Sequence, residues 1–155
     1  MDTFFAQYPT FTRPSTSGLL DCFKALSVSQ AWTPKDEEDA KINFRTAMVQ
    51  EFNTRYGTNE KDLESWRNLC RVFGIGEDKM PGSIKKCKKE IAKIHVNLVD
   101  LIELPPPSSG PVTAARIFPT LKALRKYTKR TKKYFPREEA KAGGILKNLL
   151  RNILR

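Results

Sequence analysis

The sequence predicts an all-α fold: a compact bundle of five to seven short helices with a basic C-terminal helical extension. Apolar residues recur every three or four positions along most of the chain, which is the period of one helix face. Helix-capping residues precede these stretches, and Gly or Pro follows them. The composition, 39% hydrophobic and 29% charged, is ordinary for a globular protein, and 155 residues are enough to bury a common core.

The first residues predict an aromatic arm that packs on the helices after it. Four aromatic side chains fall within eight positions without helical spacing: Phe4, Phe5, Tyr8 and Phe11. A disordered tail rarely carries so many aromatic rings. After the arm, Ser15 or Ser17 is a candidate cap for a short helix. The apolar face of this helix comprises Leu19, Leu20, Phe23 and Leu26.

A long helix is predicted to begin at Thr33. The Thr33 hydroxyl can cap it, Pro34 fits the first helical position, and the acidic residues 36–39 lie at the positive end of the helix dipole. We expect this acidic run to compensate the dipole rather than to bind a metal, because successive carboxylates point around a helix. Gly57 is a candidate helix end. The inward face comprises Ala40, Phe44, Ala47, Met48, Phe52 and Tyr56.

Further helical segments fill the chain up to Leu104. Asn59 is a candidate cap for a helix that Gly74 ends, and Ser83 is a cap for the next segment. β-branched residues and a second capping pattern at Asn97 predict a break near His95, so two helices meet there in a tight joint. The apolar positions of the two segments are Leu63, Trp66, Leu69, Cys70 and Phe73, then Ile84, Cys87, Ile91, Ile94, Leu98 and Leu101.

Prolines and glycines divide the chain into three parts. Residues 1–104 form a helical core with the aromatic arm, residues 105–111 form a Pro/Ser/Gly linker, and residues 112–155 form a basic helical segment packed on the core. In this last part, the aromatic and proline residues 134–136 interrupt the helical pattern. Residues 137–139 open a final helix, which kinks or begins only at the two glycines 143–144. Helical spacing before the interruption is kept by Ile117, Leu121, Leu124 and Tyr127.

The net charge is confined to the last third of the chain. Residues 104–155 carry thirteen Lys or Arg and two Glu, so this segment holds +11, the formal net charge of the whole protein. The preceding residues are therefore neutral in sum. Such a separation of charge creates a local positive field, which attracts phosphate polymers, anionic lipid surfaces or acidic protein patches.

Two classes of function follow from this basic segment. The first is nucleic-acid binding, in which the cations contact phosphates and two tyrosines stack on bases. The same charge is also typical of a solvated helix face or a nuclear-import signal, and it would also suit an acidic protein surface. The candidate nucleic-acid-binding residues are Lys122, Arg125, Lys126, Lys129, Arg130, Lys132, Lys133, Tyr127 and Tyr134.

The second class is a helical protein–protein interaction module. The end of the chain has one apolar side that could lie in a groove of a partner or of a second copy, which would make the protein a homo-oligomer. The competing interpretation is that this helix packs on its own core, and peripheral attachment to an acidic membrane is a lesser possibility. The candidate partner-binding residues are Ile145, Leu146, Leu149, Leu150, Ile153 and Leu154.

The sequence contains no recognisable catalytic, metal or cofactor motif, so we expect a non-enzymatic protein. His95 is the single histidine and lies between two apolar residues. The cysteines, Cys22, Cys70 and Cys87, are odd in number and widely spaced, which predicts reduced thiols. Neither a secretory signal nor a membrane span is recognised. We expect a nuclear or cytoplasmic location.

Several short sequence patterns, spread over most of the chain, carry a resemblance to known proteins. They are Phe44, Glu51-Phe52, Arg55-Tyr56-Gly57, Ser65-Trp66-Arg67-Asn68-Leu69-Cys70, Ser83, Cys87-Lys88, His95-Val96-Asn97-Leu98-Val99-Asp100-Leu101, Tyr127-Thr128, Phe135-Pro136 and Ala140-Lys141-Ala142. Together these patterns resemble a family of small, largely uncharacterised proteins of filamentous ascomycete fungi. The resemblance extends from Phe5 to Leu154 and implies an intracellular setting and a single domain. It implies no activity, and no site residue follows from it.

Overall fold

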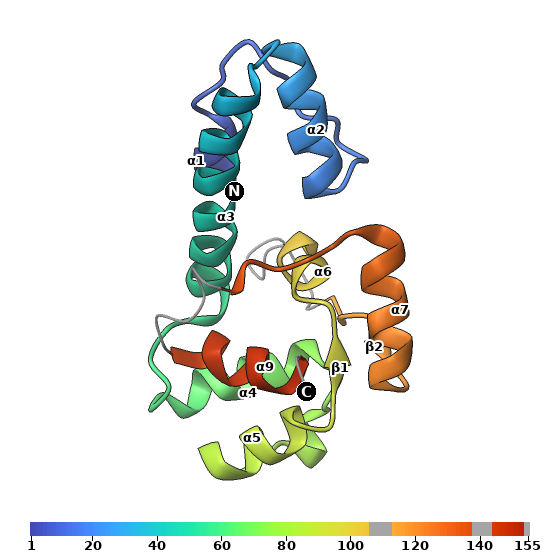
Figure 1. Cartoon of the computed structure of the whole chain (residues 1–155). Helices are drawn as coiled ribbons and strands as arrows, with labels where there is room; N and C mark the ends of the chain where they lie inside the picture. The colour runs from blue at the N-terminus through green and yellow to red at the C-terminus, as the bar shows by residue number, and fades with distance from the viewer. Residues whose placement is uncertain (106–112, 138–143, 154–155) are drawn as a thin grey trace.

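A 23-residue helix, α3 (Pro34–Tyr56), is the longest element of the protein, and the other parts of the core are arranged along it (Figure 1). The computed structural model describes residues 1–105, 113–137 and 144–153. At one end α3 carries α1 (Asp2–Phe5), and α2 (Leu19–Ser29) lies beside this end. Farther along, α3 contacts α4 (Leu63–Val72), α6 (Leu98–Glu103) and α9 (Gly144–Ile153). The predicted all-α class is confirmed.

The start of α3 has the predicted cap. The Thr33 hydroxyl oxygen accepts a hydrogen bond from the Asp36 N–H at 3.2 Å, and the Asp36 carboxylate accepts one from the Thr33 N–H at 3.1 Å. This reciprocal pair is a capping box. Gly57 ends the helix with φ of 82°, a positive angle that glycine adopts without strain. All six residues predicted for the inward face of α3 are buried.

The aromatic arm packs on the core, as predicted. Phe4 and Phe5 are buried, and the Phe4 ring lies 5.3 Å from the ring of Phe44 on α3. The cap predicted for α2 is wrong. Gly18 occupies the capping position, and the Leu19 N–H donates to the Glu103 carboxylate at 2.8 Å. A side chain 84 positions away in the sequence therefore replaces the local serine hydroxyl.

Helices α4 and α5 (Ile84–Ile91) pack against each other at the other end of α3, with a short 3₁₀ turn, η1 (Glu77–Lys79), between them in sequence. Ser83 caps α5 as predicted. The cap of α4 is Asp62 rather than the predicted Asn59, because the Asp62 carboxylate accepts from the N–H groups of residues 64 and 65. Trp66 is fully buried, and its indole N–H donates to the Glu60 carbonyl at 3.0 Å.

The predicted break near His95 is confirmed, and the structure forms a strand there. Strand β1 (His95–Val96) pairs antiparallel with β2 (Ile117–Phe118), with His95 opposite Phe118. Asn97 then caps α6, which ends before Leu104 as predicted. Ile117 was predicted on the helical face of the basic segment, but it lies in β2, and the next helix, α7 (Leu121–Thr131), begins only after Thr120.

Helix α9 begins at Gly144, one of the two positions predicted for a kink or a start. Gly144 has φ of 73°, and a Cβ atom there would lie 2.7 Å from the Thr58 carbonyl oxygen, so no other residue fits this contact. The predicted linker beyond residue 105 and the helix start at residues 138–139 lie outside the described residues. Among the described helices, none is long and apolar enough to cross a membrane.

Candidate functional site

The candidate site is the solvent-facing side of α7. This helix lies at the outer edge of the molecule and packs on the two-stranded sheet β1–β2 (Figure 1). Its buried residue is Leu124, which is 1% exposed. The rest of the helix surface is therefore half-buried or exposed, and all of its exposed residues are Lys or Arg.

Basic side chains form a row along α7. They recur at intervals of three, four and three positions, which places them along one side of a helix. We call Lys122, Arg125 and Lys129 on α7, together with Lys132 at its C-cap, the basic row, and Lys126 lies beside it. All five are exposed. Arg130, also exposed, lies on the neighbouring side, with its guanidinium 5.9 Å from the centre of the Tyr127 ring.

The lysines of this surface lack acidic neighbours among the described residues. The sequence has no Asp or Glu from residue 104 to residue 137. Among the residues that the structure describes, no carboxylate lies within ion-pair distance of Lys122, Lys126, Lys129 or Lys132. Their positive potential is therefore not neutralised by a described neighbour, and it extends into solvent as far as salt allows.

Lys133 differs from the other predicted phosphate contacts. Its ammonium lies 2.6 Å from an Asp100 carboxylate oxygen and 2.8 Å from a Glu103 carboxylate oxygen. Burial alone lowers the pKa of this ammonium, but the hydrogen bonds to Asp100 and Glu103 raise it more, so the pKa lies above its ordinary value. Lys133 therefore holds α7 to α6, and its predicted role as a phosphate contact is corrected.

The two candidate tyrosines also differ. The Tyr127 hydroxyl donates to Asp100 at 3.0 Å, and the ring lies 4.9 Å from the Phe118 ring, with the Arg116 guanidinium 4.9 Å from its centre. Burial, and next the hydrogen bond to Asp100, raise the pKa of Tyr127. Its ring is thus packed within the protein and is a poor platform for a base, which corrects the prediction. Tyr134, in contrast, is 56% exposed, so its ring is accessible from solvent.

Three residues around α6 anchor the basic segment, and sequence reasoning missed them. Asp100 and Glu103 bind Lys133, while the Asn97 side chain donates to the Thr128 hydroxyl at 3.1 Å and to the Lys133 carbonyl at 3.0 Å. Asn97 was recognised as a helix cap, but its second role depends on tertiary contacts. The available signal was the position of two carboxylates, three residues apart, directly before the chain turns basic.

The apolar residues of the predicted partner-binding helix face the chain's own core. Ile145, Leu146, Leu149 and Leu150 are 0%, 1%, 3% and 7% exposed and belong to the same cluster as the inward face of α3. This burial favours the intramolecular alternative over a docking groove on a partner, and it corrects the prediction for these four residues. The Ile153 side chain and Leu154 lie outside the described part.

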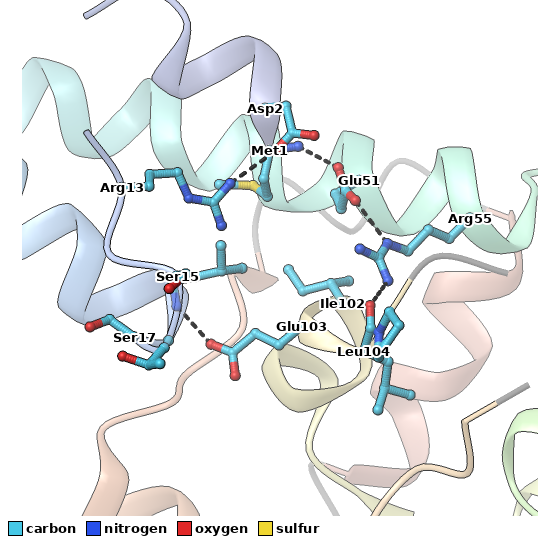
Figure 2. Close-up of a pocket in the computed structure, with 14 residues that line it drawn as sticks. Met1, Asp2, Arg13, Ser15, Ser17, Glu51, Arg55, Ile102, Glu103 and Leu104 are labelled. Carbon is cyan, nitrogen blue, oxygen red and sulfur yellow. Dashed lines mark hydrogen bonds and ion pairs between the residues drawn. The ribbon is translucent and has the colours of Figure 1, made fainter. Parts of the chain in front are cut away.

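The largest described hollow is lined by charged side chains that form ion pairs with one another. It measures about 550 Å³ and lies between the N-terminal segment, α3 and the end of α6 (Figure 2). Arg13 pairs with Asp2 at 2.9 Å, and Arg55 pairs with Glu51 at 2.8 Å and also donates to the Leu104 carbonyl. On the opposite wall the Glu103 carboxylate accepts from the backbone at the start of α2. The N-terminal ammonium of Met1 also pairs with Glu51, and this contact joins the arm to α3. No group of three or more His, Cys, Asp or Glu residues suited to a metal ion occurs among the described residues.

Comparison with known proteins identifies no relative of this chain. No protein-family model, no curated protein and no solved structure matches this chain. The resemblance to a fungal family therefore stays a prediction.

Proposed function

We propose that this protein is a non-enzymatic nucleic-acid-binding protein that holds phosphates on the solvent-facing side of α7. One observation carries the proposal: Lys122, Lys126 and Lys129 on α7 and Lys132 at its C-cap are all exposed, in a segment of 34 residues that contains no Asp or Glu. Cations in this arrangement release the counterions condensed on a nucleic acid when they meet its phosphates, and this release drives binding.

The spacing of the charges supports a repeating polyanion as the partner. From Lys122 to Lys132 the chain rises by about 15 Å, so the basic row presents a cation at about every 5 Å. The phosphates of a nucleic acid repeat regularly along its backbone, whereas carboxylates on a protein surface rarely do. An acidic protein patch is therefore the weaker candidate for this surface.

The α6 anchor supports the proposal in a second way. Lys133 and Tyr127 both bind Asp100, so α7 is held at a defined angle to the core rather than by Leu124 alone. A fixed helix presents its lysines without the entropy cost of ordering a free tail. This arrangement suits a binding surface better than it suits an import signal, which is read as an extended segment.

The proposal is tested by removing four charges from this surface. We expect joint replacement of Lys122, Lys126, Lys129 and Lys132 by Gln to weaken binding to DNA and RNA of any sequence. The slope of log K against log salt concentration should fall in magnitude by about 3, because each lost phosphate contact removes about 0.7 to 0.9. Fluorescence anisotropy over a salt series measures both quantities.

A matched control tests whether binding depends on this surface or only on the total charge of the protein. Replacing the exposed Lys79, Lys85, Lys86 and Lys89 by Gln removes the same charge from η1 and α5. We expect this control to keep most of the wild-type slope. Equal effects of the two variants would contradict the proposed surface, and a wild-type protein that binds no nucleic acid at low salt would contradict the function itself.

A further inference from the structure

A small apolar hollow lies next to the basic row, between α7, the start of α6 and α9. It measures about 150 Å³, which is about the size of one nucleobase. Four apolar side chains from four parts of the chain form its walls: Leu98, Leu124, Phe135 and Leu150. Leu124 belongs to α7, so this hollow and the basic row lie on adjacent sides of the same helix.

Tyr134 also lines the hollow and is 56% exposed, so its ring lies where the hollow meets solvent. A tight turn positions it: Lys132 has φ of 59°, and the Tyr134 N–H donates to the Lys132 carbonyl at 2.9 Å. The next two residues, Phe135 and Pro136, are half-buried and buried. The tyrosine thus follows a defined turn, directly before residues that are packed, and more than half of its surface is open to solvent.

We propose that this hollow receives an unpaired base of a single-stranded nucleic acid whose backbone lies on the basic row, with Tyr134 stacking on that base. This inference rests on the proposed function and specifies the kind of nucleic acid that the protein binds. Apolar walls and an aromatic ring suit the flat face of a base, and Lys132 and Arg137 are close enough in sequence to place positive charge beside it. A duplex keeps its bases paired and stacked, so only a single strand can place one here.

The amide group that lines the hollow contributes no base specificity. Asn97 is the amide that lines it, but its Nδ2 donates to Thr128 and to the Lys133 carbonyl, while its Oδ1 accepts from the N–H groups of residues 99 and 100. This side chain has no remaining capacity to read a base edge. Stacking tolerates every base, so we expect binding with little sequence preference.

The test compares Tyr134→Ala and Tyr134→Phe with wild type on two fluorescein-labelled probes, a single strand of about 12 nucleotides and the duplex of the same length. We expect wild type to bind the single strand more tightly. Tyr134→Ala should weaken single-strand binding about fivefold or more, with an unchanged salt slope and unchanged duplex affinity, whereas Tyr134→Phe keeps the wild-type values. Val28→Ala, at a residue that is 81% exposed and lies on α2, controls for the loss of a surface apolar group.

The outcomes distinguish this inference from the proposed function. If the four-lysine variant loses binding while Tyr134→Ala binds the single strand like wild type, the hollow receives no base, but the phosphate surface stands. If wild type binds neither probe, both proposals fail. If wild type binds polyglutamate rather than the two nucleic-acid probes, and Tyr134→Ala abolishes this binding, the occupant of the hollow is an acidic peptide and the inference is overturned.

Discussion

At the scale of single residues, burial decides which reactive groups can act. The three cysteines are buried thiols, and Cys22, Cys70 and Cys87 are each 0% exposed. Burial, and next the neighbouring Cys87 thiol, raise the pKa of Cys70 to about 12. Because the thiolate is the nucleophile, such a group is inert at neutral pH. The same reasoning at the surface explains why Lys133 differs from Lys132: carboxylates surround the first, and solvent surrounds the second.

We expect Cys70 to resist alkylation in the folded protein. At pH 8 a thiol of ordinary pKa is partly ionised and reacts with iodoacetamide, whereas Cys70 stays protonated and shielded, so its labelling requires unfolding. Mass spectrometry of peptides labelled with and without urea measures the difference. Rapid native labelling of Cys70 would show that α4 and α5 do not pack as described, and free cysteine in the same tube controls for reagent activity.

At the scale of elements, one carboxylate joins three parts of the chain. Glu103 at the end of α6 accepts from the backbone at the start of α2 with one oxygen and from Lys133 after α7 with the other. The side chain thus caps a helix and holds the basic segment, two contacts that lie 84 and 30 positions away. Its position explains why α2 needs no serine cap.

We expect Glu103→Ala to lower the free energy of unfolding by about 1 to 3 kcal/mol, because it leaves a helix N–H without its acceptor and removes one of the two carboxylates that pair with the Lys133 ammonium. Urea denaturation measures the change. Glu38→Ala, at a carboxylate that is 60% exposed, is the matched control and should stay within about 0.5 kcal/mol of wild type.

A double-mutant cycle measures how much of the destabilisation by Glu103→Ala comes from the loss of the ion pair with Lys133. Lys133→Met combined with Glu103→Ala should cost less than the sum of the two single changes, because both remove the same ion pair. Additive costs would indicate that Glu103 acts through its cap on α2 alone.

At the scale of the whole molecule, α9 completes the core although it comes last in the sequence. It contacts α3, and Ile145 and Leu146 are nearly inaccessible to solvent. Gly144 permits the close approach to the Thr58 carbonyl at the point where the helix begins. The two described helices of the C-terminal segment therefore differ in role: α9 stabilises the fold, and α7 carries exposed positive charge.

We expect Asp at both Leu149 and Leu150 to unfold the protein or to destabilise it by more than about 4 kcal/mol, because two carboxylates would replace buried side chains that are 3% and 7% exposed. Thermal melting followed by circular dichroism measures this loss. A variant that melts like wild type but loses an oligomer in sedimentation would show instead that α9 serves an interface. Asp at the exposed Lys147 is the control on the same helix.

Local chemistry explains which features could be predicted from the sequence. The capping box at Thr33, the six buried positions of α3, the Ser83 cap and the break near His95 all depend on residues within one or two helical turns of each other. The confinement of the charge to the last third is likewise a property of the sequence alone. For the same reason the basic row was recognisable before its surroundings were known.

Tertiary structure alone decided the features that depend on distant residues. Glu103 capping α2, the pairing of β1 with β2 and the ion pair of Lys133 with Asp100 join positions 21 to 84 residues apart, and no local pattern records such pairs. Ile117 lies in β2 rather than in the predicted helix. Pairing with β1 gives the Ile117 backbone hydrogen bonds that the start of a helix could not provide. Whether a lysine meets a carboxylate or water, and whether a tyrosine is packed or open, follows from where the fold places it, and this separates Lys133 and Tyr127 from Lys132 and Tyr134.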